Sequence, residues 1–112
     1  MDIQLKRGLL DLCVLSTIKD EASYGYNIIK SIKPYVEISE STLYPILRRL
    51  ENSNLITVEP SEHNGRLRKY YYITELGRER LRMFSEEWRE MVLIYRFIMR
   101  DENLEKGGTH GE

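Results

Sequence analysis

The chain has 112 residues, of which 41% are hydrophobic and 31% charged, and its formal net charge is −1. This length and balance predict one globular domain, and the net charge alone gives no support to nucleic-acid binding. No apolar run approaches the roughly 18 residues that cross a bilayer, the first residues lack the pattern of a secretion signal, and the single cysteine excludes an internal disulfide, so we expect a cytoplasmic protein.

The first predicted helix runs from Leu5 to Ile18 and is apolar on more than one face. Its apolar residues are Leu9, Leu10, Leu12, Cys13, Val14, Leu15 and Ile18. A helix of this kind is buried on several sides. Because the chain is small, we expect a second subunit to cover part of it, with Leu9 in the interface. Cys13 lies among leucines without a nearby cation, which predicts an inert thiol.

A second, short helix is predicted for residues 24–32, after Ser23 and before Pro34. Its isoleucines, Ile28, Ile29 and Ile32, are expected to face inward. With the helices on either side of it along the chain, this segment predicts a three-helix core.

The third predicted helix begins at Ser39 and ends near Asn54. Leu43, Ile46, Leu47 and Leu50 repeat at steps of three and four, which predicts one buried face. Ser39 or Ser41 is expected to cap the first backbone donors, and Asn54 to end the helix in a left-handed conformation. Pro45 is tolerated early in a helix but would kink it deeper inside.

The opposite face of this helix is polar and carries Ser41, Tyr44, Pro45, Arg48 and Asn52. A hydroxyl, an aromatic ring, a guanidinium and an amide suit the base edges and phosphates of a DNA major groove. Arg48 and Arg49 have the alternative of a plain solvated face, but the strands that follow favour DNA contact, above all for Arg48. Among the tyrosines, Tyr44 is the one expected to point outward.

Two strands are predicted over residues 55–59 and 68–73, because both segments alternate and are rich in β-branched or aromatic residues. Tyr71 and Ile73 share the face expected to be buried. The polar residues 60–67 between the strands predict a loop, in which Asn64-Gly65 signals a turn without requiring a two-residue hairpin.

This predicted hairpin is the wing of a winged helix-turn-helix, and its base carries Arg66, Arg68 and Lys69. Each is expected to neutralise a phosphate. Residues 1–74 hold ten Lys and Arg against nine Asp and Glu, so DNA binding has to depend on a local cluster that also includes Lys6 and Arg7 and is doubled in a dimer.

After Thr74, a good N-cap, one long helix is predicted from Glu75 to about Arg100. Its apolar seam, at alternating steps of three and four, consists of Leu81, Phe84, Trp88, Met91, Tyr95 and Ile98. A seam of this kind needs a partner, and we expect the same helix or the first helix of a second copy. The polar, glycine-rich tail 101–112 is expected to be disordered.

The residues that carry chemistry in enzymes are not grouped here. His63 and His110 are far apart and the chain has one cysteine, so neither a metal site nor a nucleophile paired with a base is expected. Glu86 and Glu87 are adjacent on a helix and point apart. We therefore expect no enzyme, no metal and no cofactor.

Three segments together resemble the PadR family of transcriptional regulators, specifically its shorter subgroup with one C-terminal dimerisation helix. The likeness covers about residues 5–100. The segments are Tyr24-Gly25-Tyr26, the run from Ser41 to Glu51, and the run from Gly65 to Gly77. One departure is Asn54, where the family usually has glycine.

The resemblance implies a homodimeric winged-helix repressor that binds pseudo-palindromic promoter DNA and in some members is released by a small molecule. The residues that it places at the groove are Ser41, Thr42, Tyr44, Pro45 and Arg48, with the wing from His63 and Asn64 to Lys69 on the DNA backbone. Trp88 aligns with a tryptophan that stacks planar aromatic ligands between subunits in some members. Plain packing at the interface is the alternative role of Trp88.

The predicted fold is thus mainly α with a small β-hairpin: a winged helix-turn-helix over residues 1–74, a dimerisation helix over 75–100 and a tail over 101–112. The predicted function is a homodimeric DNA-binding transcriptional regulator with double-stranded DNA and a possible aromatic effector as partners. The alternative is a winged-helix adaptor that binds a protein partner through the same basic face. Salt dependence and sequence preference on DNA distinguish the two.

Overall fold

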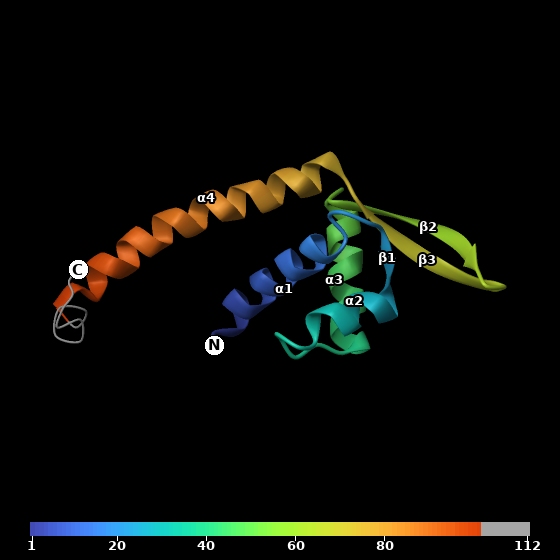
Figure 1. Ribbon diagram of the computed structural model, residues 1–112, viewed down its shortest axis with the longest axis horizontal. Helices are drawn as coiled ribbons and strands as arrows, with labels where there is room; N and C mark the ends of the chain where they lie inside the picture. Colours follow the sequence, from blue (N-terminus) through green and yellow to red (C-terminus); the bar gives the residue numbers. More distant parts are fainter. Residues whose placement is uncertain (102–112) are drawn as a thin grey trace. The chain divides into compact units, whose positions relative to one another are not determined.

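The computed structural model describes residues 1–101, which belong to two compact units that divide after Leu81. The elements in chain order are α1 (Ile3–Thr17), β1 (Ser23–Tyr24), α2 (Gly25–Ile32), α3 (Glu40–Asn52), β2 (Ile56–His63), β3 (Arg66–Ile73) and α4 (Glu75–Ile98). Figure 1 follows them along the chain. The helices and the hairpin that the sequence predicts are all present, while the two-residue strand β1 was not predicted. Apart from Asp101, the predicted tail lies outside the described residues.

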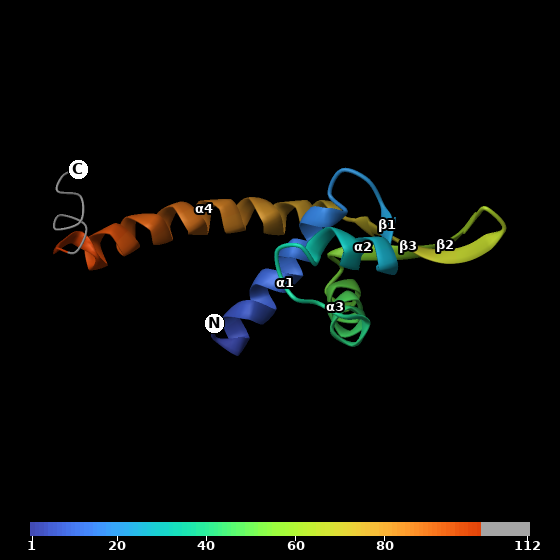
Figure 2. The same cartoon turned by 60° about the horizontal axis from the view of Figure 1, so that its bottom comes forward.

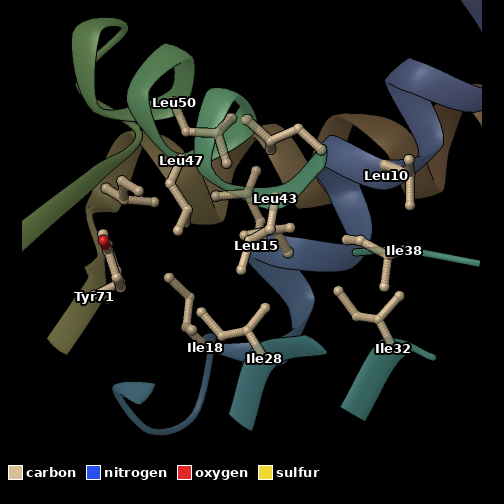
Figure 3. Packing of buried hydrophobic residues seen from close by; sticks show 13 residues of the cluster. Leu10, Leu15, Ile18, Ile28, Ile32, Ile38, Leu43, Leu47, Leu50 and Tyr71 are labelled. Atoms are coloured by element: carbon tan, nitrogen blue, oxygen red, sulfur yellow. The ribbon is translucent and has the colours of Figure 1, made fainter. Parts of the chain in front are cut away.

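The core of the first unit lies between α1, α2, α3 and the sheet (Figure 3). It consists of Leu10, Val14, Leu15, Ile18, Ile28, Ile32, Ile38, Leu43, Ile46, Leu47, Leu50, Ile56 and Tyr71. The predicted apolar face of α3 is confirmed, because all four of its residues are buried. Each fully buried aliphatic side chain contributes about 1.5–3 kcal/mol relative to exposure, so this cluster is the main stabilising feature of the unit.

Helix α1 is covered largely by its own chain. Leu12, Val14 and Leu15 are buried, whereas Leu9 is half-buried and Leu5 remains 54% exposed. The large apolar side chains that α1 leaves exposed, Ile3 and Leu5, therefore lie in its amino-terminal part.

The ends of α3 differ in how well the sequence predicts them. Ser39 is the N-cap, but the predicted side-chain cap is wrong, because its hydroxyl hydrogen-bonds those of Ser41 and Thr42 instead, at 3.0 and 3.3 Å. The predicted left-handed end is confirmed: Asn54 has φ 63°, and the Leu55 N–H donates to the Leu50 carbonyl at 2.9 Å. Pro45 is accommodated inside the helix.

The sheet has the order β1-β3-β2 and is antiparallel throughout. The predicted loop over residues 60–67 is wrong, because pairing continues from Ile56↔Ile73 to His63↔Arg66 and leaves only Asn64 and Gly65 unpaired. Both turn residues have positive φ, 53° and 76°, as a two-residue hairpin turn requires. In Figures 1 and 2 the hairpin extends past α2 and α3.

Strand β2 contains Pro60, which has no backbone N–H to donate. Proline is tolerated there because β2 lies at the edge of the sheet and has a neighbouring strand on one side only. Strand β1 forms on the other side of β3, through Ser23↔Tyr71 and Tyr24↔Tyr70. Two residues are too few to produce an alternating sequence pattern, which is why sequence reasoning placed Tyr24 in a helix.

Thr74 begins α4, as predicted. Its hydroxyl accepts from the Gly77 N–H at 3.0 Å and lies 2.8 Å from the Asn54 carbonyl oxygen. This one side chain therefore caps α4 and also joins it to the loop after α3. No helix within residues 1–101 is long and apolar enough to cross a membrane.

Candidate nucleic-acid interface

The outer face of α3 is the first part of the candidate site. Six residues predicted for DNA contact are exposed on it: Ser41, Thr42, Tyr44, Pro45, Arg48 and Arg49. They alternate with the buried residues of the same helix, so packing of the apolar face fixes which side chains point outward.

The two arginines of this face have different surroundings. Arg49 donates from Nη2 to Oδ1 of Asp11 on α1 at 2.5 Å, and the two side chains are 42% and 24% exposed. Within residues 1–101, Arg48 makes no ion pair. The positive charge of Arg48 is therefore available to a ligand, whereas that of Arg49 is partly neutralised by the Asp11 carboxylate.

The hairpin is the second part. His63, Asn64, Arg66 and Lys69 are exposed near its tip, and Arg68 is half-buried. The Arg68 guanidinium lies 4.2 Å from the centroid of the Tyr24 ring, a cation–π contact between β3 and β1. Tyr70 lies beside both Tyr24 and His63, with ring centroids 5.5 and 6.0 Å apart. A cation and three rings thus share one face of the sheet.

An open groove of about 560 Å³ is lined by residues of both α3 and the hairpin. Its lining residues are Tyr24, Gly25, Tyr26, Tyr44, Arg66, Arg68, Lys69 and Tyr71. It brings together predicted residues of both parts, Tyr44 from the helix and the three basic residues from the wing. Sequence reasoning missed Tyr24, Gly25 and Tyr26 as site residues; their segment was noted only as a family marker.

The sequence predicts that Tyr44 points outward, but its ring also packs against Gly25. It is 39% exposed, and a Cβ on Gly25 would lie 2.4 Å from its hydroxyl oxygen and 3.1 Å from Cζ. The ring therefore rests directly on the start of α2. Nearby, burial raises the pKa of the Tyr71 hydroxyl, and Tyr44 and Glu51 add to the rise because they disfavour another negative charge.

A second groove, of about 490 Å³, lies on the other side of α3, against α1. Its lining residues are Ile3, Lys6, Arg7, Leu10, Glu37, Ser41, Thr42, Pro45, Ile46 and Arg49. Lys6 and Arg7, which the sequence assigned to the basic cluster, thus lie beside the amino-terminal half of α3. Basic side chains flank the exposed helix on both sides, which is the charge distribution that a polyanion requires.

The residues that could act as nucleophiles or metal ligands are Cys13 and the His, Asp and Glu side chains. Burial raises the pKa of the Cys13 thiol, which agrees with the predicted inert thiol, because little of it is thiolate at neutral pH. Among the described residues, no three His, Cys, Asp or Glu lie close enough to hold a metal ion.

The second unit begins at Arg82 and contains the rest of α4. Its predicted seam residues are exposed in the single chain: Trp88 by 52%, Met91 by 46%, Tyr95 by 57% and Ile98 by 64%. Phe84 lies beside Trp88 with ring centroids 6.2 Å apart. Leu81, the first residue of the seam, instead belongs to the first unit and packs against its core.

Three helices, a hairpin wing and an exposed helix face between basic side chains define the first unit as a winged helix-turn-helix. The model of the PadR-like family of transcriptional regulators matches residues 14–83, and the chain belongs to that family. Members of the family are DNA-binding regulators of transcription rather than enzymes.

Individual relatives are similar to this chain over most of its length. An uncharacterized protein of Lysinibacillus sphaericus is 36% identical over 98 residues, which are 83% of this chain and 90% of the relative. A solved structure from Streptococcus mutans is 35% identical, covers 93% of this chain and 92% of its own, and has a TM-score of 0.70. A PadR family transcriptional regulator from Eggerthella lenta is 34% identical, covers 87% of each chain, and has a TM-score of 0.75.

Proposed function

We propose that this chain is a homodimeric repressor that binds pseudo-palindromic promoter DNA and acts in the cytoplasm. The exposed face of α3 reads base edges in the major groove, and the hairpin holds the DNA backbone. The observation that carries this proposal is the groove in which Tyr44 of α3 lies with Arg66, Arg68 and Lys69 of the hairpin. Base contacts supply specificity and phosphate contacts supply position, so both parts are needed.

We assign base contacts and phosphate contacts to the basic residues according to the groups that surround each of them. Arg48 has no competing carboxylate among the described residues, and a free guanidinium pairs well with guanine. The exposed Arg66 and Lys69 are phosphate ligands. Arg49 is shared with Asp11, so we assign it a smaller part than Arg48.

Dimerisation is assigned to α4 beyond the first unit. Trp88, Met91, Tyr95 and Ile98 leave a seam of exposed apolar surface, and a second copy is the partner that a symmetric regulator supplies. Residues 1–74 then bind DNA, and of the predicted dimerisation helix 75–100 the part from residue 82 onward holds the dimer. Two copies present the basic cluster twice, and because each chain has a net charge of −1, DNA binding depends on this local cluster and not on the overall charge.

The first experiment is selection of bound duplexes from a random library, followed by fluorescence anisotropy of the winners at several salt concentrations. We expect enrichment of an inverted repeat that is bound far more tightly than random DNA, with affinity that falls steeply as salt rises. A folded dimer that enriches no duplex would contradict the proposal and favour an adaptor that binds a protein partner.

Release by a flat aromatic effector is the further part of the proposal and rests on Trp88. Its indole is 52% exposed in the single chain, and two such rings in a dimer offer broad apolar surface for stacking. We expect flat aromatic compounds to quench the emission of Trp88, the only tryptophan, and to weaken DNA binding over the same concentration range. Unchanged emission across a broad panel would contradict this role.

A further inference from the structure

The junction between β1 and α2 reaches both parts of the candidate interface within two residues. Tyr24 is the last residue of β1 and pairs with Tyr70 of the hairpin strand β3. Gly25 follows at once as the first residue of α2 and lies against Tyr44 of α3. Both residues line the groove that the helix and the hairpin share, and Figure 1 shows β1 between the hairpin and α2.

Tyr24 fixes the position of a cation. The Arg68 guanidinium lies 4.2 Å from the centroid of its ring, and within residues 1–101 no carboxylate pairs with Arg68. A cation–π contact uses no hydrogen-bond donor, so the N–H groups of the Arg68 guanidinium that point away from the ring can donate to a phosphate. The ring therefore limits the conformations of a long, flexible side chain without occupying its donors.

Gly25 provides space for the side chain of Tyr44 on α3. Any Cβ at this position would lie 2.4 Å from the Tyr44 hydroxyl oxygen, so the present position of that ring requires a residue without a side chain. Among the described residues, Gly65 is the only glycine with positive φ, so the conformation of Gly25 is open to alanine. What Gly25 contributes is room for Tyr44, not backbone freedom.

We propose that Tyr24 and Gly25 are positioning residues of the DNA interface: the ring of Tyr24 holds Arg68 toward the DNA backbone, and the absence of a side chain at Gly25 lets Tyr44 take its place at the groove. This inference rests on the proposed function. Neither residue needs to touch DNA, because each acts through the side chain that it positions.

Tyr24 is tested by a double-mutant cycle with Arg68, read by anisotropy on the selected duplex and on random duplex. Tyr24→Leu removes the ring and is expected to weaken binding to both duplexes about two- to fivefold, the range for an exposed cation–π contact. Tyr24→Phe keeps the ring and should bind as the unchanged protein does. In the Arg68→Ala background, Tyr24→Leu should have no further effect.

Equal losses from Tyr24→Leu in both backgrounds would overturn the role of Tyr24, because its effect would then not pass through Arg68. Equal losses from Tyr24→Phe and Tyr24→Leu would overturn it too. Thermal melting of each variant, followed by circular dichroism, shows whether the fold is retained. Since Tyr24 pairs with Tyr70 through the backbone, we expect each variant to keep β1.

Gly25 is tested with Tyr44 in the same way. Gly25→Ala should displace the ring and reduce the preference for the selected duplex over random duplex about two- to fivefold. This is less than the roughly 5- to 150-fold that a bidentate base contact is worth, because the ring is displaced and not removed. Tyr44→Ala removes the obstacle, so adding Gly25→Ala to it should not change DNA binding and should not lower the melting temperature. A loss of preference that persists in the Tyr44→Ala background would contradict the role of Gly25.

The outcomes separate this inference from the function on which it rests. An unchanged protein that is folded and dimeric but binds no duplex would contradict the proposed function. An unchanged protein that selects a duplex, with Tyr24→Leu and Gly25→Ala selecting it equally well, would leave the function standing and overturn the positioning roles alone.

Discussion

The guanidinium of Arg49 lies 2.5 Å from the carboxylate of Asp11, although the neighbouring Arg48 makes no ion pair within residues 1–101. The pair connects α3 to α1 across 38 positions of sequence. It also distinguishes two adjacent cations that the sequence alone presents as alike. A carboxylate within hydrogen-bonding distance competes with any phosphate for Arg49, so the two arginines are expected to contribute unequally to DNA binding.

Replacement of each arginine tests this difference. Arg48→Ala should cost about 1–3 kcal/mol on the selected duplex and relax its sequence preference, as expected for a residue that reads a base. Arg49→Ala should cost less on DNA and should lower the free energy of unfolding by at most about 1 kcal/mol, because its pair is partly exposed. Anisotropy and urea denaturation measure the two effects, and equal losses of affinity would contradict the assignment.

Arg66 tests the phosphate contacts of the hairpin. Arg66→Ala should weaken selected and random duplexes alike and flatten the dependence of log affinity on log salt by about one, since one phosphate contact is lost. Lys33→Ala, at the end of α2 and outside both grooves, is the matched control and should leave the slope unchanged. Equal slopes for the two variants would exclude a phosphate contact at Arg66.

Gly77 tests the packing at the start of α4. A Cβ there would lie 2.4 Å from the carbonyl oxygen of Leu55, a backbone atom that cannot turn aside. Gly77→Ala should therefore lower the free energy of unfolding by about 1–3 kcal/mol, measured by urea denaturation. Gly8→Ala is the control: its Cβ meets nothing within 4 Å, so in the helix it should stabilise by about 0.5–1 kcal/mol. A neutral Gly77→Ala would contradict the predicted clash.

Ile98 tests the dimer seam. In a dimer, Ile98→Glu would bury an unpaired charge in the seam, which disfavours association. The variant should therefore be a monomer with a lower melting temperature. Arg89→Glu changes charge off the seam and should leave a dimer. Light scattering after size exclusion gives the mass of each variant, and a stable Ile98→Glu dimer at low micromolar concentration would refute the seam.

Ionisation of Tyr71 is expected to lower the free energy of unfolding at alkaline pH. Its pKa is raised in the folded state, mainly by burial, so its stabilising contribution is complete below its ordinary value of 10.0 and is lost as pH rises through the folded value. Tyr71→Phe cannot ionise and should lose less stability than the unchanged protein as the pH rises above about 10. Tyr72→Phe, at a position that is 40% exposed, is the control and should follow the unchanged protein.

Periodicity predicted most of the fold because a side chain's place in a regular element determines the face on which it lies. The steps of three and four in α3 identified Leu43, Ile46, Leu47 and Leu50 as buried, and the residues between them as exposed. The same reasoning identified Asn54 as the end of α3 and Thr74 as the cap of α4, since both act through contacts close along the chain. The recognition of a winged helix and of its family followed from these local features.

Only the tertiary structure decided how distant side chains meet. No periodicity reveals that Asp11 pairs with Arg49, that the Tyr24 ring contacts the Arg68 guanidinium, or that Gly25 makes room for Tyr44. The extent of the hairpin was also a tertiary result. The sequence predicted a polar loop over residues 60–67, whereas residues 60–63 pair with residues 66–69 and only Asn64 and Gly65 remain unpaired. Sequence spacing determines which residues share a face of one element, whereas contacts between elements depend on how those elements pack, and that packing positions the charges of the candidate interface.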